Sequence, residues 1–409
     1  MKNGDSINSN TTYRGWCQFM DGDGTFPMVQ SNITLPFPKK DSFYLSFNLD
    51  AEYNFLYKGF IPAHLFYHII DMRQENGLGA VVEKKKIAIQ DTLSRGHITM
   101  TKHSNNTDWW IIVAQYLSNC IFTVQVTPDG VKPPQKICVG KMTETADLGS
   151  QVAVSLNGKK YARTFSVDST FVYDFDNTTG IISNQIKLNS ISDSIYGAFQ
   201  GCVFSPNSRY LYITRFYKVF QFDMAAKDIQ ASRVLVGDYT DYPHDNPDKG
   251  YFFSCHLGPD GKIYIASPFS HLFISTINRP NCPGKLCDFR AYSIELAFYN
   301  YGALSNTAYF ETPPANYNCD SITATENISE QLYIYPNPAS MNIIISSTYD
   351  FKTYEIVNMT GQKLVTGSIK GLSDENIDVS GLTNGIYILR LTNEVKERLA
   401  IKKFSVIHR

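Results

Sequence analysis

The chain has 409 residues, with 37 basic and 38 acidic side chains and a formal net charge of −1. This balance argues against a bulk electrostatic attraction to nucleic acid or to an anionic membrane. The length predicts at least two domains. A content of 26 Tyr and 26 Phe with only 18% charged residues favours an all-β extracellular protein over a helical cytosolic enzyme. No run approaches the roughly eighteen apolar residues of a membrane span.

Three segments between residues 152 and 264 align with one another without gaps at their centres. Their turns are anchored at Ser155, Ser205 and Gly258, and each turn joins two short apolar stretches. The turns are rich in Pro, Asn, Asp and Gly, which is the chemistry of a β-hairpin. A third, aromatic-rich stretch follows each hairpin. The segments therefore predict one small antiparallel sheet each, repeated about every fifty residues.

The same pattern extends backwards to residues 98–126 and 41–70, which gives five units. A period of about 40 to 50 residues with several strands per unit predicts a β-propeller. The turns resemble WD40-like and YVTN-type propeller repeats over most of residues 37–311, although the Trp-Asp dipeptide of WD40 blades is absent. If the first blade is truncated, six or seven blades are expected in the full protein. Residues 301–310 are expected to supply a strand that closes the ring.

The richest polar stretch between two predicted blades lies at residues 238–248. Its candidate ligand residues are Asp241, His244, Asp245 and Asp248. Carboxylate and imidazole groups on a propeller loop suit a metal ion or another ligand, but surface loops are also polar without any such role. The sequence leaves both interpretations open.

The eight cysteines suggest one disulfide and one pair of core residues. Cys282 and Cys287 enclose a short Pro-Gly turn and are the best disulfide candidates. A metal site is the alternative for this pair, but no His or second Cys pair follows at zinc spacing. Cys202 and Cys255 occupy the same position in two repeats, where the preceding unit has Val152. That equivalence favours small buried core residues over a disulfide.

No nucleophile elbow, Gly-rich phosphate loop or paired-carboxylate signature is found, so the sequence predicts no catalytic residue, no cofactor and no metal site. The stretch Thr312–Asn316 contains two prolines and breaks the repeat. We therefore expect a propeller domain over residues 1–316, followed by a polar, strand-poor linker over residues 317–330.

Residues 331–409 contain short runs with period-two or near-continuous apolar character, separated by turns at Gly361-Gln362 and Asn384-Gly385. This spacing predicts a small Ig-like β-sandwich. Pro336 and Pro338 lack a backbone N–H, so residues 335–338 are expected at a strand entry or a sheet edge.

The motifs of this C-terminal region are Pro-Asn-Pro at 336–338, Gly-Gln at 361–362, Asp-Val-Ser-x-Leu at 378–382 and Gly-x-Tyr at 385–387. Their order resembles the type A C-terminal sorting domain of proteins exported by the type IX secretion system of Bacteroidetes. The resemblance implies recognition by the outer-membrane export machinery, cleavage in the linker, and release or attachment to surface lipopolysaccharide. The positions that match the family are Pro336, Asn337, Pro338, Gly361, Gly385, Tyr387, Lys402 and Lys403. The family usually ends soon after the lysine pair, so residues 404–409 predict a longer last strand here.

The stretch Met1–Ser6 is polar and turn-like, and it is not a signal peptide. Cargo of this secretion system first crosses the inner membrane, so we expect the N-terminus to be incomplete. Together these patterns predict a secreted or cell-surface propeller that acts as a non-catalytic binding or adhesion module for a protein or glycan. One alternative is a secreted glycan hydrolase or lyase with its site at the mouth of the propeller channel. Another is a structural role in the cell envelope or gliding apparatus.

Overall fold

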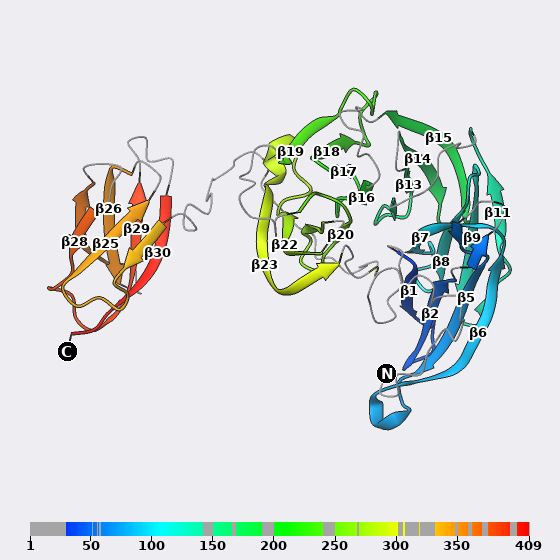
Figure 1. Cartoon of the computed structure of the whole chain (residues 1–409), viewed down its shortest axis with the longest axis horizontal. Coiled ribbons are helices and arrows are strands. Elements are labelled where there is room, and N and C mark those ends of the chain that lie inside the picture. The colour runs from blue at the N-terminus through cyan, green and yellow to red at the C-terminus, as the bar shows by residue number, and fades with distance from the viewer. Residues whose placement is uncertain are drawn as a thin grey trace. The chain divides into compact units, whose positions relative to one another are not determined.

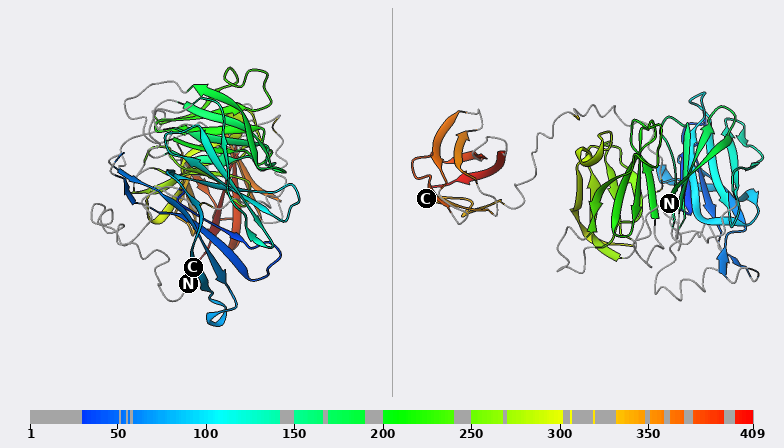
Figure 2. Two further views of the ribbon diagram at one scale, coloured as in Figure 1. Left: turned by 90° about the vertical axis from the view of Figure 1, so that its right-hand side faces the viewer. Right: turned by 90° about the horizontal axis from the view of Figure 1, so that it is seen from above.

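The computed structural model describes residues 30–50, 52–54, 56, 59–141, 150–165, 169–189, 200–239, 250–267, 270–301, 306, 319, 332–347, 351–358, 362–369, 375–392 and 399–408. The chain divides into two compact units, Met1–Tyr317 and Asn318–Arg409. Both are built from antiparallel sheets (Figures 1 and 2). Apart from Cys319, the predicted linker lies outside the described residues.

In the described part of the first unit, five antiparallel sheets have four or five strands each. The strands of each sheet are given below from the innermost outwards. The first consists of β1 (Asn32–Pro36), β2 (Phe43–Leu49), β5 (His64–Asp71) and β6 (Ala80–Gln90). The second consists of β7 (Leu93–Lys102), β8 (Trp109–Gln115), β9 (Cys120–Thr127) and, both paired with β9, β10 (Gly130–Val131) and β11 (Gln135–Cys138). The third consists of β12 (Val152–Val154), β13 (Lys160–Thr164), β14 (Ser169–Asp176) and β15 (Ile181–Asn189).

The last two sheets of this unit follow the same plan. The fourth consists of β16 (Gln200–Phe204), β17 (Tyr210–Arg215), β18 (Lys218–Asp223) and β19 (Val234–Asp238). The fifth consists of β20 (Cys255–Leu257), β21 (Ile263–Ile265), β22 (Ser270–Ile277) and β23 (Phe289–Tyr301). Additional short elements are the hairpin β3 (Glu52–Asn54) and β4 (Gly59–Ile61) and the 3-10 helices η1 (Glu75–Gly77) and η3 (Gly284–Cys287).

The five sheets are the blades of a β-propeller. Their innermost strands, β1, β7, β12, β16 and β20, contact one another in that order, and the sheets follow one another around a common centre (Figure 1). The apolar cores lie between neighbouring blades. Trp110 of the second blade packs with Tyr161 of the third, and Val203 of the fourth packs with Ile263 of the fifth. Each blade thus buries its faces against its neighbours, as the predicted propeller requires. No sixth or seventh blade is found among the described residues.

The repeated turns form as the sequence predicts. The backbone N–H groups of Ser155 and Ser205 each bond the carbonyl oxygen five residues ahead. Their hydroxyls donate to the side-chain oxygens of Asn157 and Asn207, at 2.8 and 2.7 Å. The turn at Gly258 is closed by the same kind of backbone bond, with an acceptor four residues ahead. Short polar side chains therefore fix these turns by local hydrogen bonds.

Two threonines, each near the end of the second strand of its blade, form hydrogen bonds to the next blade. Thr164 accepts a hydrogen bond from the N–H of Gln151 at 2.8 Å, and its hydroxyl lies 3.1 Å from the carbonyl oxygen of Gln200 in the next blade. Thr214 repeats this arrangement one blade later, accepting from its own inner strand and donating to the carbonyl oxygen of Phe253. Both side chains are fully buried. We call Thr164 and Thr214 the blade latches.

The second unit is a small β-sandwich. One sheet consists of β24 (Leu332–Tyr335), β25 (Asn342–Ser347) and β28 (Glu375–Asp378). The other consists of β27 (Lys363–Ser368), β26 (Thr353–Asn358), β29 (Gly385–Thr392) and β30 (Leu399–Val406). Ile343 and Ile377 from the first sheet and Leu389 and Phe404 from the second share one core. None of the helices in the described part of the chain is long and apolar enough to span a bilayer.

Candidate functional site

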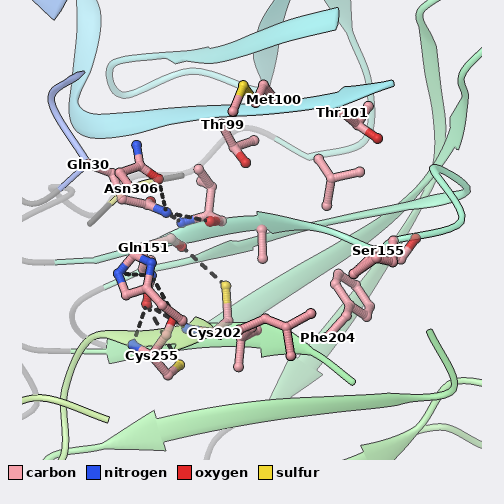
Figure 3. Close-up of a pocket in the computed structure, with 17 residues that line it drawn as sticks. Gln30, Thr99, Met100, Thr101, Gln151, Ser155, Cys202, Phe204, Cys255 and Asn306 are labelled. Atoms are coloured by element: carbon pink, nitrogen blue, oxygen red, sulfur yellow. Dashed lines mark hydrogen bonds between the residues drawn. The ribbon is translucent and has the colours of Figure 1, made fainter. Parts of the chain in front are cut away.

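A small cavity of about 80 Å³ lies on the propeller axis. It is lined by the inner strands of the second to fifth blades together with Gln30 and Asn306 (Figure 3). A cavity of this size holds a few water molecules. It is well below the roughly 300 Å³ at which pockets for drug-sized ligands begin.

The side chain of Gln151 lines this cavity and joins its own blade to the fourth and fifth blades (Figure 3). Its Nε2 donates to the carbonyl oxygen of Cys255 at 2.9 Å. Its Oε1 accepts the N–H groups of Cys202 and Cys255 at 3.2 and 3.1 Å. Sequence reasoning missed Gln151. The sequence does contain a sign of its special role, because Gln151 departs from the repeat: the next two units have Gly201 and Ser254 at this position.

Gln30 and Asn306 connect the ends of the propeller to its inner strands. Gln30 makes two hydrogen bonds with the backbone of Val152, donating through Nε2 and accepting through Oε1, both at 2.9 Å. Asn306 donates to the carbonyl oxygens of Asn32 and Ile98 at 2.9 and 3.1 Å. Asn306 belongs to the segment predicted to close the ring, so this segment touches the first two blades. Residues 302–305 and 307–310 lie outside the described residues.

Burial favours the neutral forms of three titratable side chains that line this cavity. Burial lowers the pKa of His256 to about 4. Burial also raises the pKa of the Cys202 and Cys255 thiols, which are both free and buried, as expected for core residues. Among the described residues, no group of three or more His, Cys, Asp or Glu side chains is placed to hold a metal ion.

The predicted Cys282–Cys287 disulfide is wrong. Cys287 is a free thiol, buried at the end of η3, where burial raises its pKa to about 12. Cys282 is disulfide-bonded, but not to Cys287. A further disulfide joins Cys120 and Cys138, which face each other on the paired strands β9 and β11. The prediction relied on the short separation of the two cysteines in the sequence. In the structure, the 3-10 turn of η3 instead places Cys287 in the apolar core.

The predicted ligand loop with Asp241, His244, Asp245 and Asp248 lies outside the described residues.

The described residues on either side of that loop form an aromatic cluster. Tyr251 stacks on Phe216 with 3.9 Å between ring centroids, and it lies 4.9 Å from Tyr239 and 5.3 Å from Tyr217. The three tyrosines are half-buried. They present partly accessible rings where the fourth blade meets the fifth.

In the second unit, the Pro-Asn-Pro segment is tied to the last strand. Pro336 and Pro338 follow β24, which forms the edge of its sheet, as expected for residues without a backbone N–H. The side-chain oxygen of Asn337 accepts hydrogen bonds from both the N–H and the hydroxyl of Ser405, each at 2.9 Å. Ala339 continues the contact through a backbone bond to the same residue. Asn337 thus connects residues 68 positions apart in the sequence.

Gly385 and Tyr387 begin β29. The hydroxyl of Tyr387 donates to the carbonyl oxygen of Thr383 at 2.6 Å, and its ring lies 5.9 Å from that of Phe404. Only 5% of Tyr387 is exposed. Tyr387 therefore shapes the core and its adjoining turn.

The lysine pair lies in β30. Lys403 is exposed and Lys402 is half-buried. The strand continues to Val406, and both Phe404 and Val406 are buried. The last strand thus continues past the lysine pair. Gly361 lies outside the described residues.

Residues 333–406 match the family model described as the secretion system C-terminal sorting domain. This region is a sorting domain. It assigns the chain to the type IX secretion system and to the outer cell surface or the extracellular space. Engagement with the export machinery follows from the sorting domain.

Solved structures resemble larger parts of the chain at low identity. PorZ, a bacterial surface component of the type IX secretion system of Porphyromonas gingivalis, shows 10% identity and a TM-score of 0.36, with 95% of this chain and 61% of that chain covered. This chain thus spans about three fifths of the PorZ chain. A functionally unknown protein from Desulfotomaculum acetoxidans shows 10% identity and a TM-score of 0.39, with coverages of 87% and 90%.

A protein from Lactobacillus plantarum shows 9% identity and a TM-score of 0.40, with 94% of this chain and 88% of that chain covered. Similarity at these levels carries no conclusion about function. A search of curated protein sequences gives no match to this chain.

The sorting domain presents exposed apolar side chains near its Pro-Asn-Pro motif. Tyr335 precedes this motif and is 42% exposed. Ile386 lies opposite Ser405 on the neighbouring strand and is 44% exposed. Ile407 donates its N–H to the carbonyl oxygen of Ala339 and is 49% exposed. In the described sorting domain, Tyr387 is thus buried, whereas these apolar residues, Lys403 and the hydrogen-bonded Asn337 are exposed.

Proposed function

We propose that the propeller is a non-catalytic binding module for a glycan or protein, which the sorting domain delivers to the cell surface. The observation that carries this proposal is the hydrogen bonding and the charge of the side chains at the propeller axis. The side chain of Gln151 makes hydrogen bonds there with the fourth and fifth blades, and the neighbouring His256 is neutral at pH 7 because burial lowers its pKa to about 4. General acid–base catalysis is most efficient with a group whose pKa lies near the working pH, which does not describe His256.

The aromatic cluster between the fourth and fifth blades supports a binding role. Its half-buried tyrosines, Tyr217, Tyr239 and Tyr251, combine an apolar ring with a polar hydroxyl. Such side chains are enriched where proteins recognise partners.

We further propose that the export machinery reads the exposed residues of the sorting domain. Buried motif residues such as Tyr387 shape the fold, whereas Lys403, Ile386 and Ile407 are accessible to a partner. Cleavage within residues 317–330 would then release the propeller or leave it attached to surface lipopolysaccharide.

The test uses the full chain on arrays of bacterial and host glycans and on a panel of surface proteins. We expect saturable binding to a defined subset of these molecules, without any change in their covalent structure. The alternative enzyme would instead generate new reducing ends or unsaturated sugars when incubated with polysaccharides. Release of such products, or a lack of binding to every array component, would overturn the proposal.

A further inference from the structure

A cavity of about 440 Å³ lies between the first and second blades. Two turns line it: residues 37–42, between β1 and β2, and residues 106–107, between β7 and β8. The cavity is several times larger than the one on the propeller axis. Its volume falls within the range of roughly 300 to 1,000 Å³ that is typical of small-molecule sites. We call it the turn pocket.

The turn pocket carries an excess of positive charge. Lys39, Lys40 and Lys102 line it, and Asp41 is the one carboxylate among its lining residues. Lys39 and Lys40 are exposed. Within the described part of the chain, neither of them has a carboxylate at salt-bridge distance. An anionic ligand would therefore not have to displace an existing partner of these two lysines.

Basic residues beside the first turn of two other blades are paired with carboxylates. In the third blade, Lys160 follows the first turn and is paired with Asp174 at 2.5 Å. In the fourth blade, Arg209 is paired with Asp223 at 2.8 Å. In these two blades an aspartate of the third strand neutralises a basic residue beside the turn. In the first blade the aspartate at the matching register position, Asp71 opposite Phe43, is paired with Arg73 instead. It therefore does not neutralise Lys39 or Lys40.

Aromatic rings hold two of the ammonium groups against the pocket wall. The Nζ atom of Lys40 lies 3.9 Å from the centroid of the Phe37 ring, and that of Lys102 lies 3.7 Å from a ring of Trp109. Phe37 and Trp109 are only 5% and 3% exposed, so their rings are fixed by the core. A cation–π contact restrains an ammonium group without cancelling its charge. The two turns therefore position positive charge before any ligand arrives.

The nearby Arg73 does not add to this excess. Its guanidinium lies 4.7 Å from the Phe43 ring, but it also makes a two-pronged pair with Asp71 at 2.9 and 3.0 Å. This pairing lowers the pKa of the Asp71 carboxyl, chiefly through the side-chain hydrogen bonds from Arg73. The positive charge of the turn pocket therefore comes from its lysines.

We propose that the turn pocket binds an acidic saccharide of one or two sugar units. The lysines bind its carboxylate, sulfate or phosphate group. Ser42, Asn106, Thr107 and Asp41 line the same space and offer hydrogen bonds to hydroxyls. Tyr44, which is 38% exposed, offers a ring face against which a sugar ring can pack. This assignment rests on the binding function proposed above and specifies one ligand class for it.

The experiment is a ligand-observed NMR titration of the full chain with glucuronate, glucose 6-phosphate, glucose and inorganic phosphate. We expect both acidic sugars to bind more tightly than glucose, and glucose 6-phosphate to bind more tightly than inorganic phosphate. Raising the salt from ~50 to ~500 mM should weaken binding of the acidic sugars, because exposed charges are screened.

The deciding variant carries Lys39→Gln, Lys40→Gln and Lys102→Gln. Its matched control carries Lys132→Gln, Lys227→Gln and Lys285→Gln, three exposed lysines elsewhere on the propeller, and therefore has the same net charge. We expect the pocket variant to lose at least tenfold in affinity for glucuronate, and the control to retain the wild-type value. Thermal unfolding of both variants checks that each remains folded. The single variant Lys39→Gln, at an exposed turn position, provides the readout if the triple variant does not fold.

Several results would overturn the turn pocket as an acidic-saccharide site. They are equal loss in both triple variants, equal affinity for glucose and glucuronate, or inorganic phosphate binding as tightly as glucose 6-phosphate. Failure of acidic sugars to bind, while the arrays still identify another ligand, would reject the turn pocket and leave the binding function standing. Failure on the arrays as well would reject both.

Discussion

His68 lies in the middle of β5 with 1% of its surface exposed. Its Nε2 lies 2.8 Å from the side-chain oxygen of Asn48, and its Nδ1 lies 3.3 Å from the backbone N–H of Lys85. The network assigns the ring proton to Nε2, because Nδ1 must accept from an N–H group. Burial, followed by the charges of Lys84 and Lys85, lowers the pKa of His68 to about 4. The folded chain thus holds this imidazole in its neutral form.

This arrangement predicts a loss of stability in mild acid. The unfolded chain binds a proton at His68 below its ordinary pKa of about 6.5, whereas the folded chain does so only near pH 4. The contribution to stability is complete above pH 6.5 and is lost as the pH falls to 4, amounting to about 1–3 kcal/mol. Urea unfolding of the propeller at pH 7.5, 6, 5 and 4 measures it. His68→Gln should flatten the pH dependence. An unchanged slope in this variant would contradict the assignment.

At the scale of single residues, the sequence predicted hydrogen-bonded turns correctly where the two bonded residues lie close together in the chain. Ser155 and Asn157 bond to each other within a single turn, so the motif itself contains the contact. Gln151 could not be found in this way, because its partner Cys255 lies 104 residues ahead. The cysteine prediction failed for the same reason. Spacing favoured Cys282 with Cys287, whereas the fold aligns Cys120 with Cys138 across two strands.

At the scale of elements, the blades are joined by buried polar contacts as well as by apolar cores. The blade latches, Thr164 and Thr214, each connect the inner strand of their own blade with a carbonyl group of the next. Arg163 adds a fully buried link, donating to the carbonyl oxygens of Ser118 and Gln115 in the second blade. The sequence predicts the sheets through their apolar patterns, but not these links, since their acceptors are backbone atoms of other repeats.

We expect Thr164→Val and Thr214→Val each to destabilise the propeller by about 1–3 kcal/mol. Valine has nearly the shape of threonine but leaves buried backbone groups without their hydroxyl partner. Thr34→Val is the control, because Thr34 is exposed on β1 and its hydroxyl bonds only the neighbouring Ser46. That variant should change stability by less than about 0.5 kcal/mol. Urea unfolding of the three variants tests this. An equal loss of unfolding free energy in all three would contradict a stabilising role of the hydrogen bonds between blades.

At the scale of the whole molecule, the sorting domain depends on the last residues of the chain. Phe404 and Val406 are 1% and 0% exposed, and they belong to the same core as residues from both sheets. Ser405, between them, is the partner of Asn337. The sequence predicts that the strand extends beyond Lys403, but not that its end secures the Pro-Asn-Pro motif.

Deletion of residues 404–409 should therefore block export. The deletion removes two core side chains, each worth about 1.5–3 kcal/mol, from a small domain of marginal stability. The readout is the fraction of the chain that reaches the surface or medium of a bacterium with a type IX system. A full-length chain with Phe404→Leu and Val406→Ile keeps the core apolar and should be exported. Normal export of the truncated chain would contradict this prediction.

The bond between Asn337 and Ser405 also has a consequence for quality control. Asn337, near the start of the sorting domain, is held by Ser405, 68 positions further along the chain. A polypeptide that breaks off during synthesis before Ser405 lacks this partner. We therefore expect such fragments to be retained, while chains that include Ser405 are exported.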